Sequence, residues 1–361
     1  MDILVLPGDG IGPEITKATL SVLNHVSNFD CLGLTFDIRE VGLKAYEKTG
    51  TTLPNDVMKR AREVEGIILA PLSTYEYPSR DEGGLNPSAE FRNRLHLFAN
   101  YRPSKLRNTN KTYNNIDLVI VRENTEGFYA SRSMHSGNGE FMPDANSAFA
   151  LRKITADATR DIATAAYRLA QLRRKHVTIV HKANVLKLSD GLFLRTVREV
   201  SQSYPDVASS EVLVDAAAAL LVRNPEQFDV ILTTNMFGDI LSNEAAELSG
   251  GLGSAPSLNC SHKLAMAQAS HGSAPDIAGN NIANPSGLIL SAAMLLEWLG
   301  RKHHRTDLVY AAEQIEQAID CTLRNKNTRT HEMGGTLSTS GFAEAVIANY
   351  ASENHAYNSA S

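Results

Sequence analysis

The chain has 361 residues, enough for about two domains of the usual ~100–200 residues. Apolar residues make up 43% of it and charged residues 21%, as in globular proteins with a sizeable core. Its formal net charge of −5 argues against a general binder of nucleic acid or of membrane surfaces, because both attract basic proteins.

Short apolar runs and stretches with helical spacing follow one another along the chain. Buried strands are expected at residues 3–7, 66–71, 118–123, 177–182, 211–215 and 229–235. Helices are expected at residues 13–26, 154–176, 190–204, 236–248, 285–299 and 307–323. Continuous apolar strands that alternate with helices predict an α/β fold with a largely parallel sheet covered on both faces. Residues 99–107 and the Gly/Ser-rich residues 249–257 are candidate domain boundaries.

Cysteine usage and the first residues bear on the cellular compartment. Cys31, Cys260 and Cys321 are far apart and form no CxxC pair, which argues against a disulfide scaffold or a thiolate zinc site. The opening MDILVLPGDG has no basic segment or cleavage site of a secretory signal. No run approaches the ~18 apolar residues of a membrane span. We therefore expect a cytoplasmic protein without membrane contact.

Polar side chains follow four of the expected strands. Arg122 follows LVIV, Lys182 follows VTIVH, Asp215 follows EVLV, and Asn235 follows DVILTT. Ligands of open parallel sheets bind beyond the carboxyl ends of the strands. Residues of mixed sign at these ends therefore indicate an anionic ligand with a cation site nearby, although a single charge after a strand often only marks the surface.

The cation site has candidate ligands in the helix expected at residues 236–248. Asp239 and Asn243 are four residues apart and share a helix face. Together with Asp215 they offer three oxygen ligands to Mg²⁺ or Mn²⁺. The alternative is that Asp239 caps the helix and Asn243 is an ordinary surface residue.

Arginines cluster in FRNRLHLFANYRP, at Arg92, Arg94 and Arg102. Because the guanidinium fork binds carboxylates with two hydrogen bonds, this cluster favours a substrate with several carboxylates. The nearby Lys105 leaves open that the segment is an ordinary basic face.

Two glycine-containing loops are candidates for cofactor binding. LPGDGIGPEI follows the first strand, but it is not GxGxxG and no acidic residue follows at the usual ~20 positions, so a Rossmann fingerprint is absent. The segment HGSAPDIAGNNIANP offers small residues, the imidazole of His271, the carboxylate of Asp276 and the amide of Asn284. These groups suit an adenosine.

Taken together, these segments resemble the β-decarboxylating dehydrogenases that act on isocitrate, 3-isopropylmalate, homoisocitrate and tartrate or D-malate. The resemblance covers almost the whole chain, through LPGDGIGPEI, FRNRLHLFANYRP, VIVRENTEGFY, HKANVLKLSDGLF, NPEQFDVILTTNMFGDILSNEAA, HGSAPDIAGNNIANP and MGGTLSTSGF. It implies the two-domain fold of that family, with a largely parallel central sheet and a non-Rossmann cofactor site. Residues 1–98 with 254–361 would form the cofactor-binding domain, and residues 99–253 a middle domain with substrate, metal and dimer contacts.

The resemblance also implies a mechanism and a homodimer with shared active sites. Lys182 would accept the proton of the substrate hydroxyl, and Tyr129 would protonate the enolate formed when CO₂ leaves. Asp215 and Asp239 would hold Mg²⁺ or Mn²⁺, with Asn243 where the family usually has aspartate. Lys182 and Asp215 would come from the partner subunit. The substrate would be bound by Arg92, Arg102, Arg122 and Ser88.

For the cofactor, the resemblance implies NAD. The carboxylate of Asp276 suits two ribose hydroxyls and repels a 2′-phosphate, and NADP-using relatives have lysine and tyrosine at Asp276 and Ile277. Asn184 would contact the nicotinamide. The remaining contacts to the dinucleotide would come from His271, Gly272, Ser273, Ala274, Ile277 and Asn284. The chain reads AQAS before His271, where the family commonly has Phe-Glu-Pro-Val.

The segment before Arg92 bears on the substrate substituent. Isopropylmalate enzymes present a leucine-rich helix face there, and isocitrate enzymes present a serine and an asparagine. This chain has Asn86 and Ser88 in the reverse order, and Glu90 would disfavour an anionic substituent if it faced the pocket. HKANVLKLSDGLF and RENTEGFY are closer to the NAD-isocitrate and homoisocitrate enzymes. Two alternatives remain open: a D-malate or tartrate dehydrogenase, and a non-catalytic regulatory paralogue suggested by Asn243.

Overall fold

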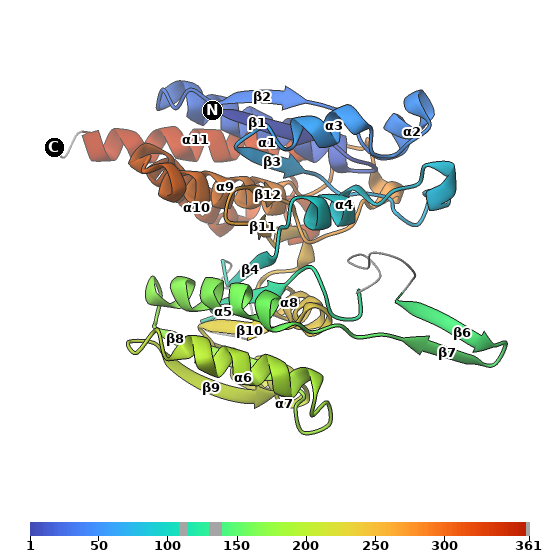
Figure 1. Cartoon of the computed structure of the whole chain (residues 1–361). Coiled ribbons are helices and arrows are strands. Elements are labelled where there is room, and N and C mark those ends of the chain that lie inside the picture. The colour runs from blue at the N-terminus through green and yellow to red at the C-terminus, as the bar shows by residue number, and fades with distance from the viewer. Residues whose placement is uncertain (108–114, 130–138, 359–361) are drawn as a thin grey trace.

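The computed structural model describes residues 1–107, 115–129 and 139–358, with backbone only for 351–358. One ten-stranded sheet runs through the chain in the order β2-β1-β3-β12-β11-β4-β5-β10-β8-β9 (Figure 1). Its first five strands are β2 (Thr35–Ile38), β1 (Asp2–Leu6), β3 (Gly66–Leu69), β12 (Ala265–Ala267) and β11 (Leu258–Cys260). Its other five are β4 (Ala99–Lys105), β5 (Asp117–Glu123), β10 (Val230–Thr233), β8 (His176–His181) and β9 (Ala208–Leu213).

Strand direction confirms a largely parallel α/β sheet. Neighbouring strands are parallel from β2 through β1 and β3 to β12, and again from β5 through β10 and β8 to β9. The three pairings at the centre of the sheet, β12 with β11, β11 with β4, and β4 with β5, are antiparallel. The carboxyl ends of β5, β10, β8 and β9 therefore lie along one edge, as the polar residues after these strands predicted.

Helices cover both faces of the sheet, and each side encloses its own apolar core. Over the first five strands, one core involves α1 (Gly12–Phe29), α9 (Ser286–His303), α10 (Thr306–Arg324) and α11 (Thr339–Asn358), and the opposite one involves α3 (Asn55–Arg60) and α4 (Pro87–Arg94). Over the other five, α5 (Ala156–Gln171) and α6 (Ser189–Ser201) pack on one face, and α7 (Val214–Arg223) and α8 (Asn235–Ser249) on the other. Helix α2 (Leu43–Thr49) follows β2.

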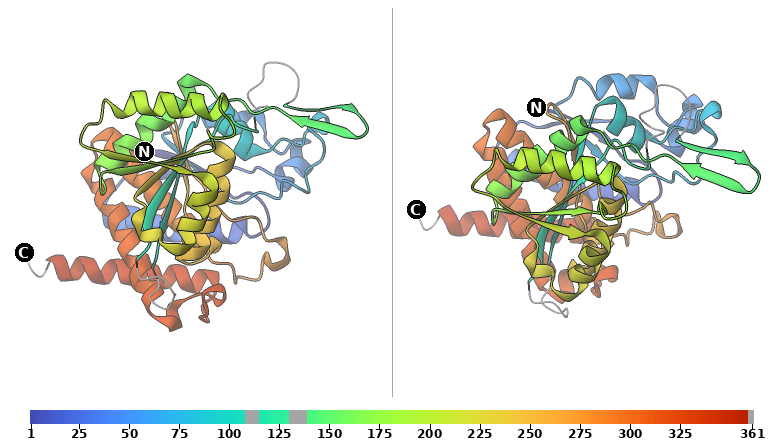
Figure 2. Two further views of the ribbon diagram at one scale, coloured as in Figure 1. Left: turned by 90° about the horizontal axis from the view of Figure 1, so that it is seen from below. Right: turned by 60° about the horizontal axis from the view of Figure 1, so that its bottom comes forward.

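A hairpin of β6 (Glu140–Asp144) and β7 (Ser147–Ala150) projects from the body of the molecule, as Figure 2 also shows. It exposes Phe141, Met142 and Phe149. Short 3₁₀ segments complete the described elements: Arg80–Glu82, Pro225–Gln227, Leu252–Ser254, Pro275–Ile277, Lys326–Thr328 and His331–Met333. None of the described helices combines the length and apolar character needed to cross a membrane.

Strand β4 was not predicted from the sequence, in which residues 99–107 were a candidate domain boundary. Its sequence ANYRPSK has no apolar run, because the buried positions Asn100, Arg102 and Ser104 are polar. These alternate positions face the same side of the sheet. Two strand ends also differ from expectation: Asp215 lies in the first turn of α7, and Asn235 is the first residue of α8.

Candidate active site

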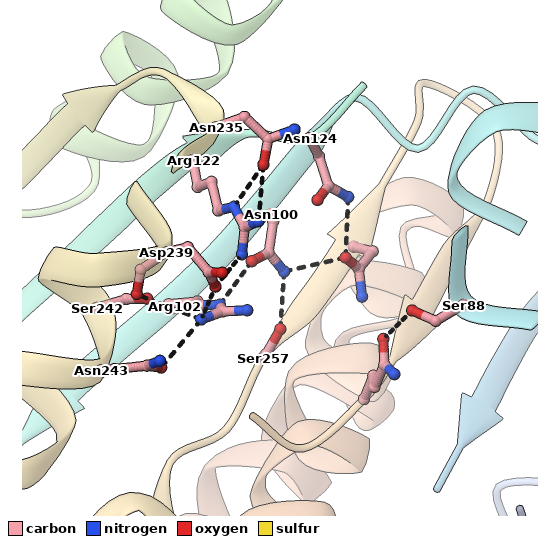
Figure 3. A network of polar contacts seen from close by, with 12 residues as sticks. Ser88, Asn100, Arg102, Arg122, Asn124, Asn235, Asp239, Ser242, Asn243 and Ser257 are labelled. Carbon is pink, nitrogen blue, oxygen red and sulfur yellow. Dashed lines mark hydrogen bonds and ion pairs between the residues drawn. The ribbon is translucent and has the colours of Figure 1, made fainter. Parts of the chain in front are cut away.

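A row of buried polar side chains crosses the middle of the sheet. Strand register places Asn259 of β11 opposite Asn100 of β4, and Asn100 opposite Arg122 of β5. Arg102 lies two residues beyond Asn100 and therefore faces the same side. Asn100 is 0% exposed, Arg122 3% and Arg102 8%. Because buried polar groups need hydrogen-bond partners, these side chains form a network of polar contacts next to α8 (Figure 3).

Arg122 is held by the start of α8. Its Nε and Nη2 donate to Oδ1 of Asn235 at 3.0 and 2.7 Å, and its Nη1 donates to Asp239 one helical turn further on. Asn235 in turn donates its amide to the carbonyl of Glu126 at 2.9 Å. The guanidinium is therefore fixed against the turn that leads to Tyr129.

Arg102 reaches the same helix from the neighbouring strand. Its Nε donates to Oδ1 of Asn100 at 2.7 Å, and its Nη1 donates to Oγ of Ser242 at 2.8 Å and Oδ1 of Asn243 at 3.4 Å. The same Nη1 lies 3.1 Å from Oδ1 of Asp239. Asp239 and Asn243 thus share a helix face, as predicted, and that face meets Arg102 (Figure 3).

The charges of this cluster favour an anion. Two guanidinium groups, Arg102 and Arg122, share the single carboxylate of Asp239. Burial, and next the charge of Arg122, lower the pKa of Arg102 to about 10, so Arg102 stays charged at neutral pH. The excess of one positive charge in a buried site attracts carboxylates.

A cavity of about 190 Å³ lies beside Arg102. Its wall includes Ser88, Arg92 and Gln268, and Oε1 of Gln268 accepts from Oγ of Ser88 at 2.9 Å and from Nη2 of Arg92 at 3.2 Å. Arg92, Arg102 and Ser88 therefore line one cavity, and their role in substrate binding stays a prediction.

The neighbouring charges of α4 point elsewhere. Glu90 pairs with Arg94 at 2.7 Å and with Arg80 at 2.9 Å, and neither Glu90 nor Arg94 lines the cavity. Arg94 is thus not part of the arginine cluster that the sequence suggested. Lys105 is also directed away, to Glu316 of α10 at 2.8 Å.

Lys182 and Asp215 form a second charged group at the carboxyl ends of β8 and β9. Nζ of Lys182 lies 2.5 Å from Oδ1 of Asp215, and this hydrogen bond holds the pKa of Asp215 below its usual range. Their side chains are 26% and 66% exposed. Within one chain the three predicted metal ligands thus make different contacts. Asp215 pairs with Lys182, whereas Asp239 and Asn243 contact Arg102. The described ranges hold no group of three or more His, Cys, Asp or Glu suited to a metal ion.

The predicted cofactor loop, residues 271–285, packs on the loop after β1. The N–H of Ile11 donates to the carbonyl of Ser273 at 2.8 Å. A Cβ at Gly10 would lie 2.0 Å from that carbonyl oxygen, so the close approach requires glycine there. Glu14 accepts from the backbone N–H of Gly279 at 2.9 Å and from two further N–H groups of the loop. The loop is therefore preformed.

Within this loop the predicted contacts differ in accessibility. Gly272 and Asp276 are exposed, whereas Ala274 and Ile277 are half-buried. His271 Nε2 is buried without a hydrogen-bond partner among the described residues, and burial lowers the pKa of the imidazole. Asn284 is buried, and its amide donates to Oγ of Ser254 at 3.2 Å. Asn184 is exposed in the turn after Lys182.

Comparison with known proteins identifies the family. Residues 2–346 match the profile of the isocitrate/isopropylmalate dehydrogenase family. An isocitrate/homoisocitrate dehydrogenase of Thermus thermophilus is 41% identical over 347 residues, which are 96% of this chain and 97% of that protein. The chain belongs to this family. A 3-isopropylmalate dehydrogenase of Methanothermobacter thermautotrophicus is 39% identical, with coverage of 96% and 97%.

The fold agrees with the same family. The crystal structure of isocitrate dehydrogenase from Methylococcus capsulatus superposes with a TM-score of 0.86 at 35% identity, covering 97% of this chain and 99% of that one. The protein is therefore an oxidoreductase that oxidatively decarboxylates a hydroxy acid.

Several residues of this dehydrogenase's polar site escaped the sequence analysis. Asn100 and Ser242 contact Arg102, Gln268 contacts Ser88 and Arg92, and Arg152 pairs with Asp190 behind Lys182. Ser242 lies three residues after Asp239, so helical spacing could have identified it. The contacts of Gln268 and the pair of Arg152 with Asp190 join distant parts of the chain and left no local signal.

The dehydrogenase should also lose stability as the pH rises from about 4 to about 7, because of Glu126. Burial raises the pKa of this carboxyl to about 7, although the N–H and hydroxyl of Thr155 donate to it at 2.8 and 3.0 Å. An unfolded glutamate titrates near ~4.3, so the stability that is present below that pH is lost progressively as the pH rises to ~7, by up to about 4 kcal/mol. The Glu126→Gln variant should show a flatter dependence. Urea unfolding of both proteins at pH 5 and 7.5 measures how far the free energy of unfolding falls between these pH values. An equal fall in both proteins would contradict this assignment.

Proposed function

We propose that this dehydrogenase carries out NAD-dependent oxidative decarboxylation of a substituted D-malate, of the isocitrate, homoisocitrate or 3-isopropylmalate type, with Mg²⁺ or Mn²⁺. The observation that carries the proposal is the buried pair of guanidinium groups, Arg102 and Arg122, that shares one carboxylate, Asp239. Arg92 and Arg102 are on the cavity wall, and Arg122 is joined to Arg102 through Asp239, so three arginines lie near a substrate that has several carboxylates.

Each catalytic step in this proposal has a group on the protein. Arg102 and Arg122 bind the carboxylates of the malate unit, and Arg92 and Ser88 face its substituent. Lys182 accepts the proton of the substrate hydroxyl as C2 is oxidised. After the β-carboxylate leaves as CO₂, Tyr129 donates a proton to the enolate carbon. The hydrogen bond from Asn235 to Glu126 supports this role, because it fixes the turn before Tyr129 to the helix that bears Asp239.

The preformed loop of residues 271–285 fits the adenosine half of a dinucleotide. Gly272 leaves open space beside it, Asp276 is exposed for ribose hydroxyls, and the buried His271 Nε2 has no hydrogen-bond partner within the described ranges. Asn184, two residues after Lys182, would contact the nicotinamide. A bound nicotinamide ring supplies the acceptor for the hydrogen and electron pair that leave C2.

Asp239 and Asn243 fit one side of a site for Mg²⁺ or Mn²⁺. Their oxygens share a helix face, and oxygen ligands are those that both cations prefer. Asp215 would complete the site from a second copy of the chain. A bound divalent cation supplies Lewis-acid stabilisation of the negative charge that develops on the substrate oxygen.

The shared site requires a homodimer, which the surface around Lys182 and Asp239 supports. The apolar side chains of Val185 and Leu188 are exposed after Lys182, and Ile240 is exposed beside Asp239. Large apolar side chains left exposed next to the proposed shared site favour burial against a second copy of the chain. We assign residues 1–98 and 254–361 to a cofactor-binding domain and 99–253 to a substrate, metal and dimer domain, in a cytoplasmic enzyme.

The cavity lining favours a substituent with a carboxylate over a branched alkyl group. Ser88 and Gln268 line the wall with Arg92, and the carboxylate of Glu90 is occupied by Arg80 and Arg94. The wall thus carries positive charge and hydrogen-bond donors without an opposing acid. Isocitrate and homoisocitrate match this lining better than 3-isopropylmalate does.

A substrate panel tests the proposed function. Purified protein with NAD⁺ and Mn²⁺ is given isocitrate, homoisocitrate, 3-isopropylmalate, D-malate or tartrate, and NADH formation is followed by absorbance. We expect the largest kcat/KM with isocitrate or homoisocitrate. The highest value with D-malate or tartrate would replace the proposed substrate, and no turnover of any of the five would favour a regulatory paralogue.

Cofactor preference should shift in the Asp276→Lys Ile277→Tyr variant. Removing the exposed carboxylate ends its repulsion of a 2′-phosphate, and the new ammonium and phenol provide partners for that phosphate. We expect the ratio of kcat/KM for NADP to that for NAD to rise by about tenfold or more, which corresponds to ~1.4 kcal/mol. The Asp276→Asn variant, which removes only the charge, serves as the control. An undiminished preference for NAD in the double variant would mean that Asp276 does not face the ribose.

A further inference from the structure

A buried ion pair lies directly behind Lys182. Asp190, the second residue of α6, is 0% exposed, and its Oδ2 accepts the backbone N–H of Lys182 at 2.6 Å. Its other oxygen, Oδ1, pairs with Nη1 of Arg152, whose side chain is 8% exposed. The carboxylate therefore joins the backbone of Lys182 to the guanidinium of Arg152.

The guanidinium of Arg152 also contacts the elements on its other side. Its Nη2 donates to Oγ1 of Thr234 at 3.1 Å, and its carbon lies 5.7 Å from the ring centroid of Phe128 and 5.2 Å from that of Phe237. Such contacts are within the range of cation–π attraction. Thr234 immediately precedes Asn235, which holds Arg122, and Phe128 immediately precedes Tyr129.

We propose that Arg152 and Asp190 are positioning residues for two active sites at once. On one side the pair fixes the backbone of Lys182, and on the other it fixes the start of α8 and the turn before Tyr129. The inference rests on the proposed homodimer, in which Lys182 serves the site of the partner while Tyr129 and Asp239 serve the site of their own chain. The ion pair thus lies at the junction between the two sites.

The exposure of the groups around Lys182 explains why this anchor matters. The ammonium of Lys182 pairs with Asp215, which is 66% exposed, and exposed pairs hold a side chain only weakly. The buried bond from the Lys182 N–H to Asp190 is charge-assisted and shielded from water. Because proton transfer depends on placing the base within hydrogen-bond reach, loosening this anchor should lower kcat more than it changes substrate binding.

Hybrid dimers allow each side of the pair to be tested separately. One chain carries Lys182→Met and the other carries Tyr129→Phe, so the hybrid has one competent site, with Tyr129 from the first chain and Lys182 from the second. Arg152→Lys, which keeps the charge but not the forked geometry, is placed in either chain. In the second chain it tests the anchor of Lys182, and in the first chain it tests α8 and the turn before Tyr129.

We expect kcat of the hybrid to fall about tenfold or more in either placement. With Arg152→Lys in the Lys182-donating chain, KM for the hydroxy acid should stay within about twofold. An Arg152→Met substitution in that chain should lower kcat further than Arg152→Lys does. A kcat within twofold of the unmodified hybrid, in either placement, would overturn the corresponding half of the proposal.

Thr234→Val provides a milder, matched variant that keeps the pair with Asp190 intact. It removes only the acceptor of Arg152 Nη2, so kcat should fall about threefold or more in the Tyr129-donating chain and stay unchanged in the Lys182-donating chain. If Thr234→Val lowered kcat equally in the two placements, Arg152 would not act on the two sites through separate contacts. Melting temperatures of all hybrids report on folding. An unmodified hybrid without activity, despite proven subunit exchange, would instead contradict the proposed shared site.

Discussion

Replacing Lys182 by Met is expected to lower kcat by about 10²–10⁴-fold while leaving NAD binding measurable, because a general base contributes rate enhancement of this size. Methionine keeps most of the apolar stem of lysine but has no amine to accept a proton. The anchor to Asp190 uses the backbone N–H of Lys182, so the substitution leaves that hydrogen bond in place. NADH formation at saturating substrate measures kcat, and titration of the variant with NAD measures binding.

Mixing Lys182→Met with Tyr129→Phe should restore activity if the sites are shared. A one-to-one mixture forms hybrids in half of its dimers, and each hybrid has one competent site of two, so about a quarter of wild-type activity is the expected upper limit. The matched control mixes Lys182→Met with a chain that carries both substitutions, which leaves no competent site. If activity stays at the control level after subunit exchange has been demonstrated, Lys182 serves its own chain.

The part of the site at strand ends could be predicted from the sequence. Buried parallel strands read as continuous apolar runs, so the first polar residue after each run marks a carboxyl end. Arg122, Lys182, Asp215 and Asn235 lie at such ends of four parallel neighbours, and the structure gathers them along one edge of the sheet. The helical spacing of Asp239 and Asn243 was informative for the same reason, since a shared face follows from local geometry alone.

The rest of the site depends on contacts that no local pattern records. Strand β4 is central yet reads as a loop, because its buried face is made of Asn100, Arg102 and Ser104. Asn100 bonds to Asn259 of β11, and Arg102 bonds to Ser242 of α8. Arg152 and Asp190 are 38 residues apart in the sequence and each resembles an ordinary helix-flanking charge. Such partnerships become visible only when the chain folds, because desolvation makes unpaired buried polar groups costly.

The pairing of Asp239 with two arginines sharpens an expectation for Asn243. Arg102 donates to Oδ1 of Asn243 at 3.4 Å, and the same nitrogen lies 3.1 Å from Asp239. Arg102, Arg122 and Asp239 together carry two positive charges and one negative charge. This excess of positive charge disfavours a divalent cation until substrate carboxylates occupy the arginines. Asn243→Asp would bring the cluster to neutrality and would add a charged oxygen ligand on the same helix face.

We therefore expect Asn243→Asp to lower the Mn²⁺ concentration for half-maximal activity by about ten- to a hundredfold, or ~1.4–2.8 kcal/mol. Unit charges ~4 Å apart attract by about 4 kcal/mol at an effective dielectric of ~20, and a divalent ion by about twice that, but desolvation offsets most of the gain. KM for NAD should change less. Asn243→Ala is the control that removes the oxygen and should raise the Mn²⁺ requirement. If neither substitution alters that requirement, Asn243 does not face the cation, and Asp239 and Asp215 would be its protein ligands without it.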